Sequence, residues 1–216
     1  MQQFLFSFTS SGKKQEELKV KTVSSILIYL GLSLVAVSLI SLFLIYFSIF
    51  RLEVEYQTLG PGKVSQKQNL KPKDTEFGIV IPKIRANAKV VPNVDPFNSS
   101  AYQFALTKGV AHAKGSSFPD SDGNVFLFSH SSVNFYEASK YNSIFYLLDK
   151  LEKGDQIQIY YKNKEHKYNV YDKKLVDPRD ISYLKKNSDK KTLTLMTCWP
   201  PGTTFQRLLI LAKGEN

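Results

Sequence analysis

Three residues in the C-terminal half of this chain could together carry out acyl transfer. They are Cys198, the only cysteine of the chain, with His130 and Arg207. A cysteine thiol becomes a strong nucleophile when a neighbouring histidine raises its thiolate fraction, and the same histidine can later protonate a departing amine. An arginine can donate hydrogen bonds to the oxyanion that forms when a carbonyl carbon is attacked. This combination predicts a cysteine nucleophile that acts on a carbonyl group.

Each residue also has a structural interpretation. Cys198 could be a small buried apolar side chain, His130 could serve packing, and Arg207 could form an ion pair at a strand end. The other two histidines fit catalysis less well, because His112 has a structural or supporting setting and His166 lies in a lysine-rich hairpin, where we expect it to be solvated. The three chemically suited residues all lie at predicted strand ends, which favours catalysis.

The elements that must position these residues are mainly strands. Short runs of β-branched and aromatic residues are separated by turn signals, and the predicted helices are few and short. This pattern predicts a mainly β barrel or sandwich. The expected strands include residues 79–81, 89–91, 124–129, 155–161, 167–171, 192–197 and 207–212, and short helices are expected at 102–107, 145–151 and 180–186.

The N-terminal part of the chain predicts a membrane anchor. Residues 22–50 contain no charged side chain. As a helix, the apolar part would reach roughly 37 Å, which is enough to cross a hydrocarbon core of about 30 Å. A cleaved signal peptide would be shorter and would end at small residues.

Four segments follow from this reading. We expect a short cytoplasmic N-terminus at 1–21, a transmembrane signal anchor at 22–50, a polar linker at 51–76 and a catalytic domain at 77–216. The expected location is a single-pass protein of the cell membrane, with the C-terminal domain outside.

Composition excludes some classes of protein. A single cysteine allows no disulfide within the chain and no zinc site made of several thiolates. The formal net charge is +10, but lysines are interleaved with acidic residues and no arginine-rich arm occurs. We therefore expect no nucleic-acid partner, and a basic domain facing an anionic envelope uses the same charge equally well.

Several motifs resemble those of the sortase family. Thr194-Leu-Met-Thr-Cys198, followed nine residues later by Arg207, resembles the sortase signature Thr-Leu-x-Thr-Cys with an arginine on the next strand. Gly123-Asn-Val-Phe-Leu-Phe-Ser-His130 resembles the strand that leads to the family's catalytic histidine. The likeness runs from about Phe77 to Ala212 and includes the segments 79–84, 109–119 and 147–155 in the family's order.

The resemblance implies an eight-stranded sortase β-barrel with short helices, preceded by one transmembrane helix. It implies that Cys198 attacks the Thr–Gly carbonyl of a Leu-Pro-x-Thr-Gly-like sorting signal, with His130 as acid and base and Arg207 holding the oxyanion or the substrate backbone. The acyl group would pass to an amine of peptidoglycan or of a pilin lysine, which attaches proteins to the cell wall or to each other. Thr197 would be a substrate-binding residue.

The same resemblance favours class D or E, because the connecting loops are short. We expect no cofactor and no metal, since no acidic cluster indicates a calcium site. Two alternatives remain open at the level of sequence. One is an anchored, non-catalytic β-domain that binds peptide or cell-wall polymer, and the other is a cysteine protease that passes the acyl group to water.

Overall fold

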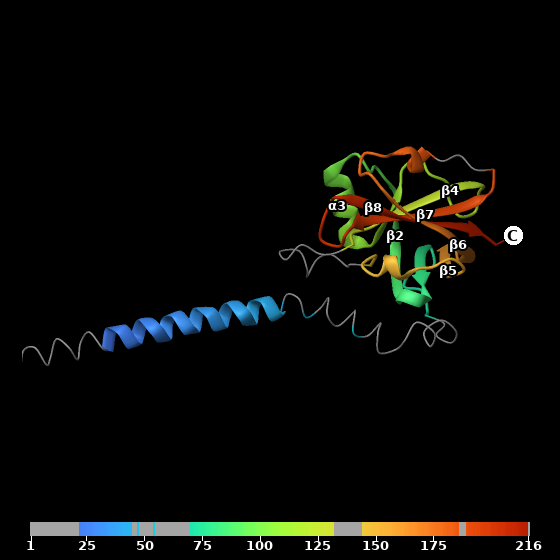
Figure 1. The fold of residues 1–216 in the computed structure, drawn as a ribbon. Coiled ribbons are helices and arrows are strands. Elements are labelled where there is room, and N and C mark those ends of the chain that lie inside the picture. Colours follow the sequence, from blue (N-terminus) through green and yellow to red (C-terminus); the bar gives the residue numbers. More distant parts are fainter. Residues whose placement is uncertain are drawn as a thin grey trace, which may run out of the picture. The chain divides into compact units, whose positions relative to one another are not determined.

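The protein is described by a computed structural model that covers residues 22–44, 47, 54, 70–131, 144–185 and 189–215 (Figure 1). The chain divides into two compact units, Met1–Glu55 and Tyr56–Asn216, which are considered separately. The predicted segments between 1 and 21 and most of the predicted linker lie outside the described residues, so the segment boundaries given above stay predictions.

The first unit contains one long apolar helix, Thr22–Leu44. Its 23 residues have a mean hydropathy of 2.5 over the most apolar window, and none of that window is buried within the protein. A helix of this length spans about 35 Å. An uncovered apolar helix near the N-terminus fits the predicted membrane anchor.

The second unit is a closed barrel of eight antiparallel and parallel strands, which confirms the predicted fold class. Around the barrel the strand order is β1-β2-β3-β4-β7-β8-β6-β5, and β5 pairs with β1 to close it. Helix α3, Ser99–Lys108, packs beside β2 and β3 (Figure 1). The strands are β1 Phe77–Ile81, β2 Ala86–Val94, β3 Val110–Ala113, β4 Gly123–Phe128, β5 Gln156–Tyr161, β6 Lys164–Val176, β7 Lys191–Trp199 and β8 Gln206–Gly214.

Several predicted elements are confirmed with changed bounds. The helix expected at 102–107 begins earlier, because the Asn98 side chain accepts a hydrogen bond from the Ala101 N–H and caps α3. The other two helices are short 3-10 turns, η2 Leu148–Lys150 and η3 Ser182–Lys185. A further 3-10 turn, η1 Pro82–Ile84, and the strand β3 had no sequence prediction, since four residues are too few to show a period.

The hairpin between β5 and β6 turns where the sequence predicts it. Lys162 and Asn163 both have positive φ, of 50° and 62°, as a two-residue turn between twisted antiparallel strands requires. This turn also receives the chain entering the barrel, because the N–H groups of Lys162 and Asn163 donate to the carbonyls of Glu76 and Thr75. Residues 70–76 therefore pack against the barrel before β1 begins.

Alternation along β4, β7 and β8 separates two apolar layers. Side chains at odd positions of β4 and β7, such as Val125 and Leu195, point into the barrel. Side chains at even positions, such as Phe126 and Met196, point outward and join a second cluster with Leu106 of α3. Because a strand presents alternate residues to opposite faces, both faces of these central strands are apolar. The sequence already indicated this for the last strand, which is buried from Leu208 to Ala212.

A buried polar contact links β4 to β7. The Asn124 Oδ1 accepts hydrogen bonds from the hydroxyls of Thr192 at 3.1 Å and Thr194 at 3.0 Å. A buried amide oxygen that keeps two donors avoids the cost of an unpaired polar group. These bonds favour one register between the two parallel strands, because a slip of one residue would turn these side chains to the other face.

His112 is fully buried in β3 and is neutral. Its Nδ1 accepts from the Asn93 N–H at 3.3 Å, so Nε2 carries the proton and donates to the Ser117 carbonyl at 3.0 Å. The ring stacks on Phe118 with centroids 4.6 Å apart. Burial lowers the pKa of His112 below its usual value, although the bond to Ser117 opposes the shift. The histidine is structural, as the sequence suggested.

We predict that this histidine makes the domain less stable in mild acid. Its pKa is lower in the folded than in the unfolded chain, so its contribution is complete above about pH 6.5 and is lost as pH falls below that value. One such group changes the free energy of unfolding by at most about 1.4 kcal/mol per pH unit. Urea unfolding of residues 51–216 between about pH 7.5 and pH 5.5 measures it.

The variant His112→Gln should show a flatter dependence of unfolding free energy on pH, even if it is less stable throughout. His166 is half-buried rather than solvated, and burial with the charge of Lys191 lowers its pKa as well. The comparison variant His166→Gln therefore separates the two contributions. An unchanged slope in His112→Gln would contradict the assignment.

Candidate active site

The pairing of three strands brings the predicted catalytic residues into one row. Cys198 of β7 is the direct partner of Arg207 of β8. On the other side, β4 runs parallel to β7 with Phe128 opposite Met196, and the Ser129 N–H donates to the Met196 carbonyl at 3.2 Å. Continuing this register by two residues places His130 beside Cys198. The strand pairing therefore places His130 and Arg207 on either side of the cysteine.

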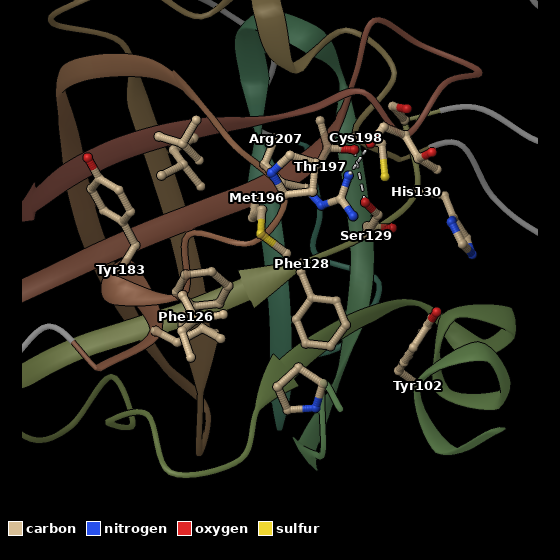
Figure 2. A pocket seen from close by; sticks show the side chains of 18 of the residues that line it. Tyr102, Phe126, Phe128, Ser129, His130, Tyr183, Met196, Thr197, Cys198 and Arg207 are labelled. Carbon is tan, nitrogen blue, oxygen red and sulfur yellow. Dashed lines mark hydrogen bonds between the residues drawn. The ribbon is translucent and has the colours of Figure 1, made fainter. Parts of the chain in front are cut away.

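All three side chains belong to the outer face of the barrel. Phe126 and Phe128 on β4 and Met196 on β7 lie in the outer cluster, and His130 and Cys198 have the same parity. In the view of Figure 2, the Cys198 sulfur lies between the guanidinium of Arg207 and the imidazole of His130. Both Cys198 and His130 are half-buried.

A cavity of about 460 Å³ opens over this row. Its floor is the outer face of β4, β7 and β8, and its walls are α3 on one side and the chain after β6 on the other. Figure 2 shows Tyr102 of α3 and Tyr183 on opposite sides of the two floor phenylalanines. The lining includes Leu106 of α3, Phe126 and Phe128 of β4, Met196 of β7, and Asp180, Tyr183 and Leu184 of the chain after β6.

Arg207 is oriented by the loop that precedes it. Its Nη1 donates to the Thr204 carbonyl at 3.3 Å and to the Gln206 carbonyl at 3.2 Å. The loop itself is closed by Thr203, whose N–H donates to the Pro200 carbonyl at 3.0 Å. These bonds fix one end of the guanidinium and leave a planar, permanently charged donor group beside Cys198. Such a group can stabilise an oxyanion on a carbonyl attacked by the sulfur.

Thr197, the residue before Cys198, contacts the chain next to His130. Its side chain is 2% exposed, and its hydroxyl donates to the Ser129 carbonyl at 2.9 Å. Although Thr197 lines the cavity, the hydroxyl is directed at the backbone of β4, one residue before His130. The structure thus places Thr197 where it holds the end of β4 against β7, and its predicted contact with substrate stays a prediction.

The cavity walls were not predicted from the sequence. Residues of α3 and of the segment 176–184 line the cavity although they are distant in sequence from Cys198. The only available signal was the apolar side chains of two short predicted helices, which is equally typical of core packing. The packing of Leu106, Tyr183 and Leu184 against Phe126 decides that these helices flank the site.

The described residues contain no group of three or more His, Cys, Asp and Glu side chains that could hold a metal ion. The groups in this row that could take part in acyl transfer are a thiol, an imidazole and a guanidinium. The family model of the sortase domain matches residues 79–215, which is more than half of the chain.

The chain belongs to the sortase family. It is 31% identical over 156 residues to sortase D of Bacillus subtilis, with 70% of each protein covered. This likeness is consistent with a class D-like sortase. Sortases are in general cysteine transpeptidases that act on sorting-signal proteins and amine acceptors, so family membership supports an enzyme of this kind.

Solved structures of sortases share the fold. Sortase C-1 from Actinomyces oris is 26% identical, with a TM-score of 0.55, 77% of this chain covered and 84% of that chain. Sortase C1 from Streptococcus suis is 25% identical, with a TM-score of 0.55 and coverages of 66% and 74%. The sortase D5 transpeptidase of Clostridium perfringens, at 22% identity and a TM-score of 0.53, shares the fold over 77% of this chain and 94% of that chain.

We predict that Thr197 acts by positioning the end of β4. The variant Thr197→Val keeps the shape of the side chain but leaves the Ser129 carbonyl without its buried donor, which costs about 1–3 kcal/mol of stability. Unfolding of the folded domain in urea measures this loss. If His130 depends on this contact, the rate of thioester formation at saturating peptide should fall several-fold while KM changes little.

The variant Thr197→Ser serves as the control, because it retains the hydroxyl and should recover most of the rate. A rise in KM with an unchanged maximal rate would instead assign Thr197 to direct substrate binding.

Proposed function

We propose that this protein is a membrane-anchored sortase that uses Cys198, His130 and Arg207 to join a sorting signal to an amine. The main support for this proposal is the row His130–Cys198–Arg207, which follows from the pairing of β4, β7 and β8 and lines the cavity. A nucleophile, a proton carrier and an oxyanion donor in one row are the set of groups that acyl transfer needs.

The first half of the reaction makes a thioester. The Cys198 thiolate attacks the carbonyl carbon of threonine in a Leu-Pro-x-Thr-Gly-like signal, and the carbonyl oxygen becomes an oxyanion that Arg207 stabilises. The tetrahedral intermediate collapses with cleavage of the bond between carbon and the glycine nitrogen. The His130 imidazolium donates its proton to this nitrogen, so the glycine fragment leaves as a neutral amine.

The second half returns the enzyme to its starting state. An amine attacks the thioester carbon, and neutral His130 accepts the proton that the amine loses. The new amide bond forms as the carbon–sulfur bond breaks, and Cys198 leaves as a thiolate. The acceptor amine belongs to peptidoglycan or to a pilin lysine, so the product is a protein attached to the cell wall or to another protein.

The segments outside the barrel are part of the proposal. Residues 1–21 are cytoplasmic, residues 22–50 cross the membrane once, and 51–76 link the anchor to a catalytic domain at the outer surface of a bacterial cell. The uncharged, uncovered helix Thr22–Leu44 supports this arrangement. Protease accessibility in intact cells tests the orientation, because a domain on the outside is digested without lysis.

We predict that Cys198→Ala forms no acyl-enzyme while the barrel remains folded. The wild-type domain should gain a mass that corresponds to a peptide ending at threonine when it is incubated with a Leu-Pro-x-Thr-Gly peptide library. Intact mass spectrometry measures the adduct, and circular dichroism checks the fold of the variant. Turnover by Cys198→Ala would reject Cys198 as the nucleophile.

The alternatives give different products. A cysteine protease would release only the free acid, with the same products when amines such as triglycine are added. A non-catalytic binding domain would form no adduct, and Cys198 would resist alkylation by a small thiol reagent. A branched or extended peptide product that increases with amine concentration supports transpeptidation over both.

We predict that Arg207→Ala lowers kcat/KM by an amount equivalent to about 2–4 kcal/mol, because one oxyanion donor is lost. Arg207→Lys keeps the charge but not the planar fork and should recover only part of the loss. His130→Ala should lose most activity in both half-reactions. Steady-state release of the glycine fragment measures these changes, and a wild-type rate in Arg207→Ala would remove its proposed role.

A further inference from the structure

The cavity over the active site has an uneven distribution of charge. At one end lie the cationic Arg207 and the titratable His130, beside the cysteine. Along the wall formed by the chain after β6 lies one carboxylate, Asp180, and no other Asp or Glu is found among the described residues that line the cavity. The floor between them is apolar, with Phe126, Phe128 and Met196.

Asp180 carries a negative charge that faces solvent and the cavity. Its side chain is exposed, and its Oδ1 accepts the Ser182 N–H at 3.0 Å. Hydrogen bonds from Ser182 lower the pKa of the Asp180 carboxyl, so it is ionised at neutral pH. The neighbouring cation, Arg179, is held by Asp177 through two bonds of 2.9 and 3.1 Å. The charge of Asp180 is therefore not balanced by this arginine.

The position of Asp180 along the cavity follows from the elements on either side. Val176, the last residue of β6, is the partner of Arg207 and so lies level with the catalytic row. The Tyr183 carbonyl accepts a bond from the Asn124 side chain at 3.5 Å, near the start of β4. The distance from Asn124 to His130 along the strand is about 20 Å. In the chain, Asp180 lies between Val176 and Tyr183, so it belongs to the part of the wall between the catalytic row and the start of β4.

The acyl half of the substrate is the half that this wall can contact. Once the thioester has formed, the acyl peptide stays attached to Cys198, whereas the leaving fragment and the incoming amine must exchange with solvent. The wall beside the apolar floor of the cavity therefore suits the acyl peptide. An extended peptide advances about 3.3 Å per residue, so the roughly 20 Å between His130 and Asn124 corresponds to about six residues, enough for the signal and the residue that precedes it.

We propose that Asp180 is a specificity residue that binds the ammonium or guanidinium group of a basic side chain in the peptide, on the N-terminal side of the cleaved bond. This inference rests on the proposed function. In a Leu-Pro-x-Thr-Gly-like signal, the positions free to vary within reach of a lysine side chain are x and the residue that precedes leucine. Asp180 thus favours signals with a basic residue at one of these two positions.

The size of the preference follows from the exposure of Asp180. Ion pairs between solvent-exposed groups are weak, so a lysine peptide should have a kcat/KM about three- to fivefold higher than that of its glutamate counterpart. The preference should decrease when the ionic strength is raised to about 1 M, because salt screens exposed charges. Peptides with glutamine at the same position should lie between the two.

The test uses the full-length chain in detergent and two series of peptides, with Lys, Gln or Glu either at x or directly before leucine. Release of the glycine fragment in the absence of added amine measures thioester formation alone. We expect Asp180→Asn to abolish the preference for lysine and Asp180→Lys to reverse it, with the glutamine peptides cleaved at similar rates by all three proteins. Glu165→Gln, which removes a carboxylate far from the cavity lining, is the matched control.

Each other outcome overturns the inference in a distinct way. If Asp180→Lys leaves the ratio of kcat/KM for the lysine and glutamate peptides unchanged, Asp180 does not contact the basic side chain. If Glu165→Gln changes this ratio as much as Asp180→Asn does, the preference arises from the net charge of the protein and not from Asp180. A preference that appears only when amine acceptors of different charge are compared assigns Asp180 to the acceptor instead of the peptide. If wild-type protein forms no thioester with any peptide, the proposed function itself is rejected, which is distinguishable from a thioester that forms without charge preference.

Discussion

The parallel pairing of β4 with β7 is the constraint on which the site depends. His130 and Cys198 are 68 positions apart in the chain. Their neighbours Ser129 and Thr197 have the same separation and are joined by a hydrogen bond between the two strands. Only the shared register of the two strands makes them neighbours. That register is supported by buried bonds from Thr192 and Thr194 to Asn124 and from Thr197 to the Ser129 carbonyl. Because the period of a strand is two, a slip of one residue would turn His130 away from Cys198.

The same strands carry two apolar layers, and this explains how a small barrel can hold a substrate cavity. The inner faces of β4, β7 and β8 fill the barrel core, while their outer faces form the floor beneath α3 and η3. The proposed catalytic residues lie at the ends of the outer rows of β4, β7 and β8. In the proposed reaction, a thioester on Cys198 would lie next to this apolar surface, which limits the access of water from that side.

Local sequence signals predicted most of the strands and the residue types that could carry out acyl transfer. Alternating or continuous apolar runs predicted most strands of the barrel, the turn at Lys162 and Asn163, and the anchor helix. The motif around Cys198 and the run that ends at His130 indicated the sortase family, which the family model and the sortase D relative show. The strand β3 was missed because four buried residues carry no period, and His166 was expected to be solvated because lysines surround it in sequence, whereas inward alternation on β6 half-buries it.

By itself, the sequence determined which groups are present: one thiol, a histidine and an arginine at strand ends, and an apolar segment long enough to cross a membrane. Tertiary structure decided which groups meet. The order of strands around the barrel places Arg207 and His130 on opposite sides of Cys198, directs Thr197 to the backbone of β4, and brings α3 and Asp180 to the cavity walls. These contacts join residues far apart in the chain, and their geometry depends on the register and closure of the barrel, which no local pattern of residues specifies.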